Sequence, residues 1–407
     1  MSYSPLTLIN RFLYVAVSCA LSLSVLAEGK TLTVTLTGQS MIRSDIRATS
    51  PDAVPRIKAL LSGDVVFTNL EGVIAEPQGP TDKRPGFLIP PAALDSLSTF
   101  GFNLLSLANN HSFDAESAGI VDTLREVKQR NIAFAGTGKT LTEASSAGYL
   151  RTKNGTVALI ASASGLIAEG GKATHDKPGV NELRLFAGDK RNDATKDLPG
   201  APSNRIDKED AARILQSIRE AKGHADLVVV YQHNHVFSNH SFANIFYEGL
   251  AERLSPDKWL QRWTHEEIDA GADIVVMHGA PLLHGVEIYK GKPIFYDLGN
   301  FIFNAPPAIW AIGEPIVFES VVATIEYQDN KLKSIALKPI EMNFLGKGPG
   351  DFESRYAAND FVKTRGLPSL ATGDKANYIL ARVAELSRPF GTKIEMKDGA
   401  ARIKLSK

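Results

Sequence analysis

Cysteine is almost absent from this chain of 407 residues: the only one is Cys19, in an N-terminal apolar stretch. A chain cleaved after that stretch has no thiol, which excludes disulfides, thiolate metal sites and cysteine nucleophiles. An excess of either charge is also lacking, since 45 Lys and Arg face 45 Asp and Glu. No basic stripe indicates nucleic acid as a partner, and no acidic block indicates a solvating tail.

The N-terminus carries the pattern of an export signal. Arg11 precedes an apolar stretch over 12–26, and Val25-Leu26-Ala27 offers small side chains for cleavage. We therefore predict a signal peptide over 1–27 and an exported protein, either periplasmic or extracellular. Two alternatives stay open, an uncleaved anchor and a lipid on Cys19, and both imply membrane association. The stretch is shorter than the ~20 apolar residues of a spanning helix.

Beyond Ala27, strand and helix patterns alternate, which is typical of an α/β protein. Helices are predicted over 54–61, 92–100, 119–130, 259–270 and between an Asp207 N-cap and Gly223. Strands are predicted over 31–37, 65–67, 104–107, 227–230, 274–276, 294–298 and 317–327. We expect a main domain over 28–345 with long loops at 168–206 and 236–256. A C-terminal extension over 346–407 is expected to hold a hairpin that turns at Asp398-Gly399.

Four of these short, β-branched strands end in carboxylate, amide or imidazole side chains. Their almost continuous apolar runs indicate strands buried on both faces. In open α/β sheets, functional sites gather beyond the carboxyl ends of such strands. The polar residues that follow the four runs are, in chain order, Asn69 and Glu71, then Asn110, His111 and Asp114, then His233 and His235, and finally His278.

A carboxylate, an amide oxygen and two imidazoles suit a borderline divalent ion such as Mn²⁺, Fe²⁺ or Zn²⁺. Such an ion lowers the pKa of water and polarises a phosphoryl or carbonyl oxygen. We predict His111 as the general acid, oriented by Asp114. His233 and His235 are expected to face opposite sides of an extended segment, so that one of them is a ligand. The predicted ligands are Glu71, Asn110, His233 and His278.

Each residue also has an ordinary structural interpretation. Glu71 could cap a helix or lie on the surface, and the Asn110, His111 and Asp114 side chains could stabilise a loop by hydrogen bonds. Arg43, Arg47, Lys83 and Arg84 could line a cleft for an anionic substrate or lie on the solvated surface, and we favour the surface.

Three blocks of the sequence resemble the bacterial poly-γ-glutamate capsule-synthesis family of the CapA type. They are Asn69-Leu70-Glu71, Ala108-Asn109-Asn110-His111 with Asp114, and residues 287–301, and the resemblance extends over about 31–345. It implies a calcineurin-like metallophosphoesterase fold, an α/β protein with a four-layer α/β/β/α sandwich. It also implies an anionic polymer or phosphoester substrate, and capsule-synthase membrane proteins as partners.

The chain departs from that family at two motifs. Gly38-Gln39 stands where the family has Gly-Asp, and His278-Gly279-Ala280-Pro281 stands where it has His-His-Pro-His. A neutral amide is a poorer ligand for a hard cation than a carboxylate, so we hypothesise one ion per chain. His284 could replace a lost histidine. The additional candidates for the site are Gln39, Asn69, His235, His284 and Asn300.

These observations favour a metal-dependent hydrolase or transferase of the cell envelope. Its substrate bond would be a phosphoester or a γ-glutamyl amide. The alternative is a non-catalytic scaffold that binds an anionic polymer in a degenerate cleft, an interpretation favoured by Gln39 and Pro281.

Overall fold

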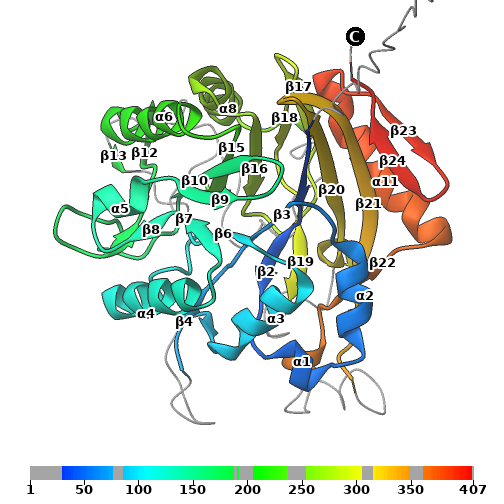
Figure 1. Ribbon diagram of the computed structural model, residues 1–407, viewed down its shortest axis with the longest axis horizontal. Helices are drawn as coiled ribbons and strands as arrows, with labels where there is room; N and C mark the ends of the chain where they lie inside the picture. The colour runs from blue at the N-terminus through cyan, green and yellow to red at the C-terminus, as the bar shows by residue number, and fades with distance from the viewer. Residues whose placement is uncertain are drawn as a thin grey trace, which may run out of the picture.

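Two large β-sheets face each other in this computed structural model, and helices lie outside them (Figure 1). The structure describes residues 30–76, 86–187, 190–191, 205–236, 254–304, 315–347 and 361–405. The predicted signal peptide, Lys83 and Arg84 lie outside these residues. Within the described ranges, no helix combines the length and the apolar character that crossing a bilayer requires.

The first sheet joins parallel strands to an antiparallel half. β1 (Thr31–Leu36), β3 (Val65–Asn69), β6 (Leu104–Ser106) and β7 (Ala133–Ala135) are parallel neighbours. On the other side of β1 the antiparallel strands follow in the order β20, β21, β24 and β23, with β22 also on β21. Their bounds are β20 (Glu319–Gln328), β21 (Lys331–Met342), β22 (Pro368–Leu370), β23 (Ile394–Lys397) and β24 (Ala400–Ile403).

The second sheet has a parallel centre and antiparallel edges. Its order is β17-β18-β16-β15-β10-β9. The parallel strands are β18 (Lys292–Phe295), β16 (Ile274–His278), β15 (Leu227–Asn234) and β10 (Thr156–Ser164); the edges are β17 (Val286–Tyr289) and β9 (Gly148–Arg151). Phe67 of β3 and Tyr231 of β15 bring their ring centroids to 5.6 Å, so the two sheets pack face to face.

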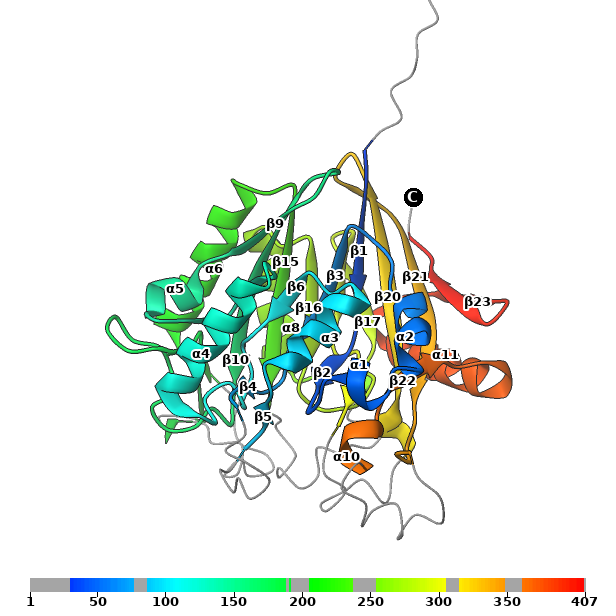
Figure 2. The same ribbon diagram turned by 60° about the horizontal axis from the view of Figure 1, so that its bottom comes forward.

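Short strands complete the edge at which β1 and β3 end, which is the lower edge in Figure 2. β2 (Gln39–Met41) pairs with β19 (Asn300–Phe303), and β4 (Val73–Ile74) pairs with β5 (Leu88–Ile89). Two further small sheets complete the fold: β8 (Thr137–Gly138) pairs with β11 (Gly179–Val180), and β12 (Leu185–Ala187) lies between β13 (Lys190–Arg191) and β14 (Arg205–Ile206).

Helices cover the sheets, and the second sheet separates two clusters of the hydrophobic core. One core cluster fills the space between the sheets and extends under α2, α3, α4 and α11. A second cluster lies between the second sheet and helices α6 and α8. The helices are α1 (Ile46–Thr49), α2 (Ala53–Leu60), α3 (Ala92–Phe100), α4 (Glu116–Gln129), α5 (Leu141–Ser145), α6 (Lys208–Lys222), α8 (Lys258–Ala270), α10 (Phe361–Thr364) and α11 (Gly373–Ser387).

The structure confirms the mixed α/β class and the predicted elements to within a few residues. Asp207 caps α6 by accepting from the backbone N–H groups of Glu209 and Asp210, as predicted. The hairpin turns at Asp398 and Gly399, both with positive φ. In the expected loop 168–206, the described part contains β11, β12, β13 and β14. Most of the other expected loop, 236–256, lies outside the described residues. The extension over 346–407 adds β22, β23 and β24 to the first sheet.

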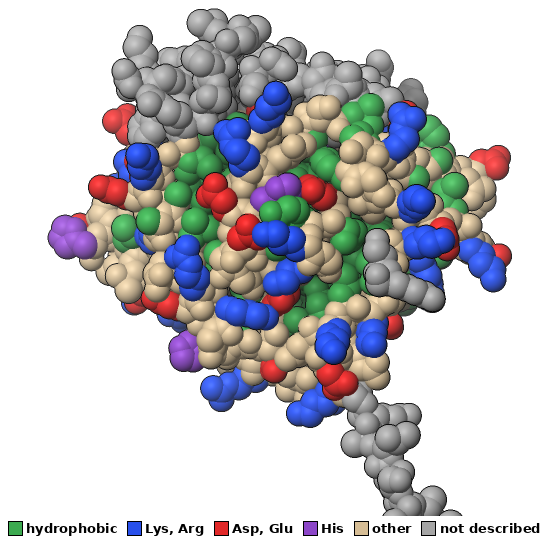
Figure 3. Space-filling view, turned by 90° about the horizontal axis from the view of Figure 1, so that it is seen from above, with side chains coloured by type: hydrophobic (Ala, Val, Ile, Leu, Met, Phe, Trp, Pro, Cys, Tyr) green, Lys and Arg blue, Asp and Glu red, His purple; other side chains and the backbone are tan. Residues whose placement is uncertain are grey.

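The outer surface carries mixed charge on the face of Figure 3. Lys and Arg side chains there are spread among Asp and Glu side chains rather than gathered in one patch. This agrees with the equal numbers of acidic and basic residues in the sequence.

One buried carboxylate ties the segment around β12 to α6. The Asp210 side chain is fully buried and accepts hydrogen bonds from Lys172 Nζ at 2.5 Å, Arg184 Nε at 2.6 Å and Arg213 Nη1 at 2.5 Å. Burial alone raises the pKa of Asp210, but the bonds from Arg184, Arg213 and Lys172 outweigh it and hold the pKa at about 2.

Asp210→Asn is expected to lower the free energy of unfolding by about 2 kcal/mol at pH 7, because the amide cannot balance three cations. The folded-state pKa lies below the ordinary 3.8. The wild type should therefore lose this stability as the pH falls from about 4 to about 2, whereas the variant should not. Urea denaturation at several pH values measures both effects. The exposed Asp122→Asn is the control, and equal midpoints for Asp210→Asn and wild type at pH 7 would contradict the prediction.

Candidate metal centre

Strands of both sheets end at one place, and the predicted site residues lie there. Glu71 follows β3 and Asn110 follows β6 of the first sheet, while His233 and His278 end β15 and β16 of the second. Parallel strands deliver their carboxyl ends to the same edge, which explains why residues far apart in sequence meet. The placement of these four residues at strand ends agrees with the sequence prediction.

A close backbone crossing positions Gln39 at this edge. A Cβ on Gly38 would lie 2.5 Å from the Gly299 carbonyl oxygen, so only glycine fits there. The Gln39 N–H donates to that same oxygen at 3.0 Å. The Gln39 side chain then donates from Nε2 to Asn300 Oδ1 at 3.2 Å. Gln39 and Asn300, two additional candidates, therefore bind each other through their amides.

Asn109 fixes the two loops of the first sheet against each other. Its Nδ2 donates to the Leu70 carbonyl at 2.8 Å and to Asn69 Oδ1 at 3.3 Å. Its Oδ1 accepts from the backbone N–H groups of His111 at 3.1 Å and Gly72 at 3.3 Å. Asn109 and Asn69 thus stabilise these two loops by hydrogen bonds.

Glu71, His233 and His235 form a compact group whose ligand atoms all lie within 4.8 Å of one another. All three side chains are buried. Asn110 joins the group, because its Oδ1 lies 2.9 Å from His233 Nε2. Asn110 Oδ1 is thus within hydrogen-bond distance of the group and could join the imidazoles and the carboxylate around an ion.

The other nitrogen of His233 is fixed by Tyr231. The Tyr231 hydroxyl lies 3.0 Å from His233 Nδ1. A hydroxyl can accept a hydrogen bond from Nδ1–H, which leaves Nε2 as the ligand atom. Tyr231 is fully buried between the sheets and was not among the predicted site residues.

The expectation that His233 and His235 face opposite sides is wrong. Their ring centroids lie 4.8 Å apart. Residues i and i+2 of an extended segment share one face, because successive side chains alternate. The two-residue spacing of His233 and His235 in the sequence was already sufficient to predict a shared face. Both imidazoles belong to the ligand group.

His278 lies next to this group but outside it. It pairs in register with His233, and its ring centroid is 5.4 Å from that of Tyr231. Burial lowers the pKa of His278 to about 3, against a small opposing effect of the Thr37 backbone. His284, the suggested replacement for a lost histidine, also lies outside the compact group; its backbone N–H donates to the Asp297 carbonyl at 3.0 Å.

The electrostatics of the group favour a bound cation. Burial raises the pKa of Glu71 to about 7, with His111 lowering it and Asp114 raising it. Burial lowers the pKa of His235 to about 3 and that of His233 well below its usual range, so both imidazoles are neutral ligands. Glu71 Oε2 is buried and has no hydrogen-bond partner in the described part of the chain. An unpaired carboxylate oxygen beside two neutral imidazoles fits a divalent ion.

His111 and Asp114 form a pair beside the ligand group. Asp114 Oδ2 lies 2.7 Å from His111 Nδ1 and also accepts from the Phe87 N–H at 2.6 Å. Burial lowers the pKa of His111, but the hydrogen bond and charge of Asp114, with Glu71, outweigh it and raise the pKa overall. The His111 side chain is 30% exposed, so a substrate can reach its ring.

The preference for a surface position is wrong for Arg43. Its guanidinium carbon lies 3.9 Å from the centroid of the Phe87 ring, and its Nε is buried. Arg47 does fit the surface interpretation, because its side chain is 40% exposed and pairs with Asp45 and Asp95. No local pattern in the sequence distinguishes Arg43 from Arg47, because contact with Phe87 depends on the tertiary fold.

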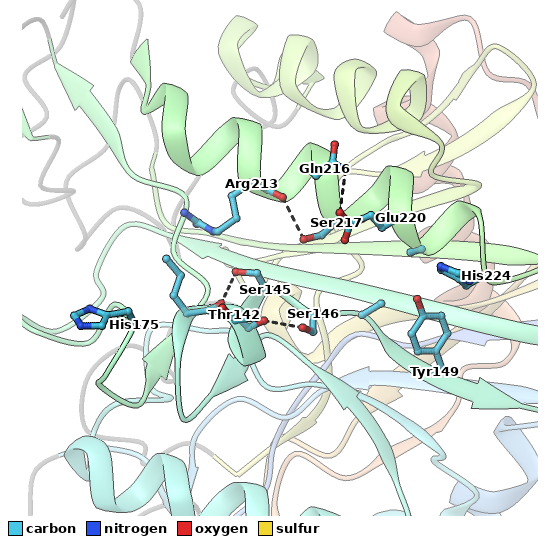
Figure 4. A pocket seen from close by; sticks show the side chains of 13 residues that line it. Thr142, Ser145, Ser146, Tyr149, His175, Arg213, Gln216, Ser217, Glu220 and His224 are labelled. Carbon is cyan, nitrogen blue, oxygen red and sulfur yellow. Dashed lines mark hydrogen bonds between the residues drawn. The ribbon is translucent and has the colours of Figure 1, made fainter.

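A hollow of about 610 Å³ lies elsewhere, between α5 and α6 (Figure 4). None of the predicted site residues lines it. Several of its polar groups are already bonded locally: Ser145 Oγ donates to the Leu141 carbonyl and Ser217 Oγ to the Arg213 carbonyl. The hollow is therefore separate from the candidate metal centre.

Comparison with known proteins identifies the family of this chain. The family model described as "Bacterial capsule synthesis protein PGA_cap" matches residues 33–305. The protein y4sH of Sinorhizobium fredii is 30% identical, covering 86% of this chain and 87% of the relative. The "PGA biosynthesis protein CapA" of Bacillus subtilis is 31% identical over 208 residues, which cover 51% of this chain and 44% of the relative.

Among solved structures, a hypothetical protein from Thermus thermophilus aligns with a TM-score of 0.41 and 13% identity, covering 76% of this chain and 98% of the other. The family match covers the strands and loops that build the candidate metal centre, from β1 to β19. The resemblance to the CapA type is thereby confirmed, and the chain belongs to the bacterial capsule synthesis protein family.

Proposed function

We propose that this protein is a metal-dependent hydrolase or transferase of capsule or poly-γ-glutamate synthesis. The observation that carries the proposal is the position of His111, a partly exposed imidazole oriented by Asp114, beside the buried group of Glu71, His233 and His235. A structural histidine needs no cluster of buried ligand atoms at its side. The substrate bond is a phosphoester or a γ-glutamyl amide of an anionic polymer.

Glu71, Asn110, His233 and His235 would hold the ion, with His278 next to them as the remaining predicted ligand. When bound, a divalent ion such as Mn²⁺, Fe²⁺ or Zn²⁺ lowers the pKa of water and polarises a phosphoryl or carbonyl oxygen. One ion per chain is proposed, because Gln39 is neutral and its Nε2 donates to Asn300.

His111 supplies the proton in this proposal. Asp114 binds Nδ1, so Nε2 is the nitrogen that can donate to the leaving oxygen or nitrogen. The raised pKa of His111 increases the protonated fraction near neutral pH, which a general acid requires. Asp114 orients the ring and is itself held by the Phe87 N–H.

The finer features of the setting also belong to the proposal. The fold is a four-layer α/β/β/α sandwich of the calcineurin-like type, which the two core clusters on either side of the second sheet support. The protein is exported to the cell envelope, with an anionic polymer as its substrate and capsule-synthase membrane proteins as further partners.

A non-catalytic polymer-binding role is the second candidate. It is favoured by Gln39, whose neutral amide binds Asn300, and by Pro281 at a position where the family has a histidine ligand. Under this alternative the cleft binds a chain without cleaving it.

Metal content and metal-dependent turnover distinguish the two candidates. Residues 28–407 are expected to retain about one transition metal per chain by elemental mass spectrometry. With Mn²⁺ or Zn²⁺, they should cleave a bis(p-nitrophenyl) phosphate, a γ-glutamyl anilide or poly-γ-glutamate, and a chelator should stop the reaction. A protein that binds the polymer but holds no metal and cleaves none of these substrates would be the scaffold.

A further inference from the structure

Arg43 is fixed in place by Asn304 at the edge where β2 ends. The Arg43 N–H donates to Asn304 Oδ1 at 3.0 Å, and the Asn304 N–H donates to the Met41 carbonyl at 2.9 Å. Asn304 is fully buried between these segments. The backbone that carries Arg43 is therefore held on the same edge as Gln39, close to the metal centre.

The guanidinium of Arg43 lies over the ring of Phe87. The guanidinium carbon lies 3.9 Å from the ring centroid. Phe87 in turn donates its N–H to Asp114 and has its ring centroid 6.0 Å from that of His111. Arg43, Phe87 and the His111–Asp114 pair thus form one continuous wall beside the ligand group.

One nitrogen of this guanidinium is buried without a partner. Arg43 Nε has no hydrogen-bond acceptor in the described part of the chain, and none of the ion pairs between described residues includes Arg43. Asp114 is near enough to raise the pKa of Arg43, yet its Oδ2 is already bonded to His111 and Phe87. Burial dominates and lowers the pKa of Arg43 to about 10, which leaves the side chain protonated at neutral pH.

Arg47, in the same segment, forms ion pairs with two carboxylates. Its Nη2 lies 2.8 Å from Asp45 Oδ2 and 3.3 Å from Asp95 Oδ2. Arg43 differs in being half-buried, stacked on an aromatic ring and short of acceptors beside a candidate acid. A planar guanidinium held in this way is suited to donate to the oxygens of a phosphoryl or carboxylate group.

We propose that Arg43 is a substrate-binding residue that holds an anionic oxygen, from a phosphoryl or a carboxylate group, beside His111. This inference deepens the proposed function and rests on the same site. It assigns to the centre a specificity for bonds with an anionic oxygen close to the point of cleavage. A purely structural Arg43 would pack on Phe87 and leave anion affinity unchanged.

Anion binding to the protein over residues 28–407 tests the proposal by calorimetry, with Mn²⁺ and with a chelator. The probes are inorganic phosphate and γ-glutamylglutamate, whose responses separate the phosphoryl from the carboxylate source. Arg43→Met keeps the stem and removes the charge; it should weaken the binding of at least one probe by about 10-fold or more. Arg43→Lys should weaken it less, because it keeps the charge but lacks the planar fork. Arg47→Met is the matched control and should bind within about twofold of wild type.

Two results would overturn the inference: unchanged binding of both probes by Arg43→Met, or no saturable binding of either probe by the wild type. Thermal unfolding confirms that each variant is folded, and Arg43→Lys provides the test if Arg43→Met is not. Failure of the proposed function looks different. If the wild type cleaves no substrate but binds a probe through Arg43, the hydrolase proposal is refuted and the anion site stands. If Arg43→Met is active and binds the probes as the wild type does, only the anion site is refuted.

Discussion

Replacing His111 with Asn is expected to lower turnover by about 10²- to 10⁴-fold while the fold and the bound metal are retained. In the wild type, Asp114 Oδ2 lies 2.7 Å from His111 Nδ1, and the amide of Asn can still donate a hydrogen bond to it. The amide cannot supply a proton to a leaving group. The His111 side chain is 30% exposed and leaves no large cavity when shortened, so the free energy of unfolding should change little.

The loss should depend on the leaving group if His111 is the acid. A p-nitrophenolate departs without help, so His111→Asn should impair its release far less than that of an alkoxide or amine, which needs the proton. The control is His175→Asn, because the His175 side chain is 91% exposed and contacts only Asp176 among the ion pairs described. Equal losses with good and poor leaving groups would contradict the acid role. A lowered melting temperature or lost metal would indicate a structural one.

Much of the fold could be predicted because its signals are local. Buried strands such as β15 and β16 read as apolar runs, and helix α6 has both its cap and its periodicity in the sequence. Helix α11 carries an equally clear pattern at Ala376, Ile379 and Leu380, yet it was not among the predicted elements. The order of strands in the two sheets has no local signal, since β20 pairs with β1 across almost the whole chain.

The candidate site, like the fold, could be predicted only in part. The rule that parallel strands end together was enough to place Glu71 near Asn110 and His233 near His278. That the two sheets end at the same place depends on the tertiary fold. The contact of Gln39 with Asn300 depends on the pairing of β2 with β19, and that of Arg43 with Phe87 on how the segment after β2 packs beside β5. The sequence reveals neither. His235 is different, because the alternation of side chains along a strand was sufficient to place it with His233.

Glu71→Gln is expected to remove the stabilisation that metal gives the protein without harming the metal-free form. At a free metal concentration of about 100 times the dissociation constant, an ion bound only by the folded state adds about 2.7 kcal/mol to the free energy of unfolding. Gln lacks the negative charge that a divalent ion requires, so the variant should gain less than about 1 kcal/mol under the same conditions. Denaturant unfolding with and without Mn²⁺ or Zn²⁺ measures both quantities.

The stabilities of wild type and Glu71→Gln without metal provide the more specific test. Glu71 is 3% exposed, and its Oε2 has no hydrogen-bond partner in the ranges described. A neutral side chain of the same shape should then be equally or more stable, because burying an unpaired carboxylate is unfavourable. Glu267→Gln is the matched control: Glu267 is fully buried on α8, and burial raises its pKa well above the usual range, but it lies outside the ligand group. That variant should keep the full metal-induced gain. If metal-free Glu71→Gln is instead strongly destabilised, the carboxylate has a structural role. If the metal stabilises Glu71→Gln as much as it stabilises the wild type, the ion binds elsewhere.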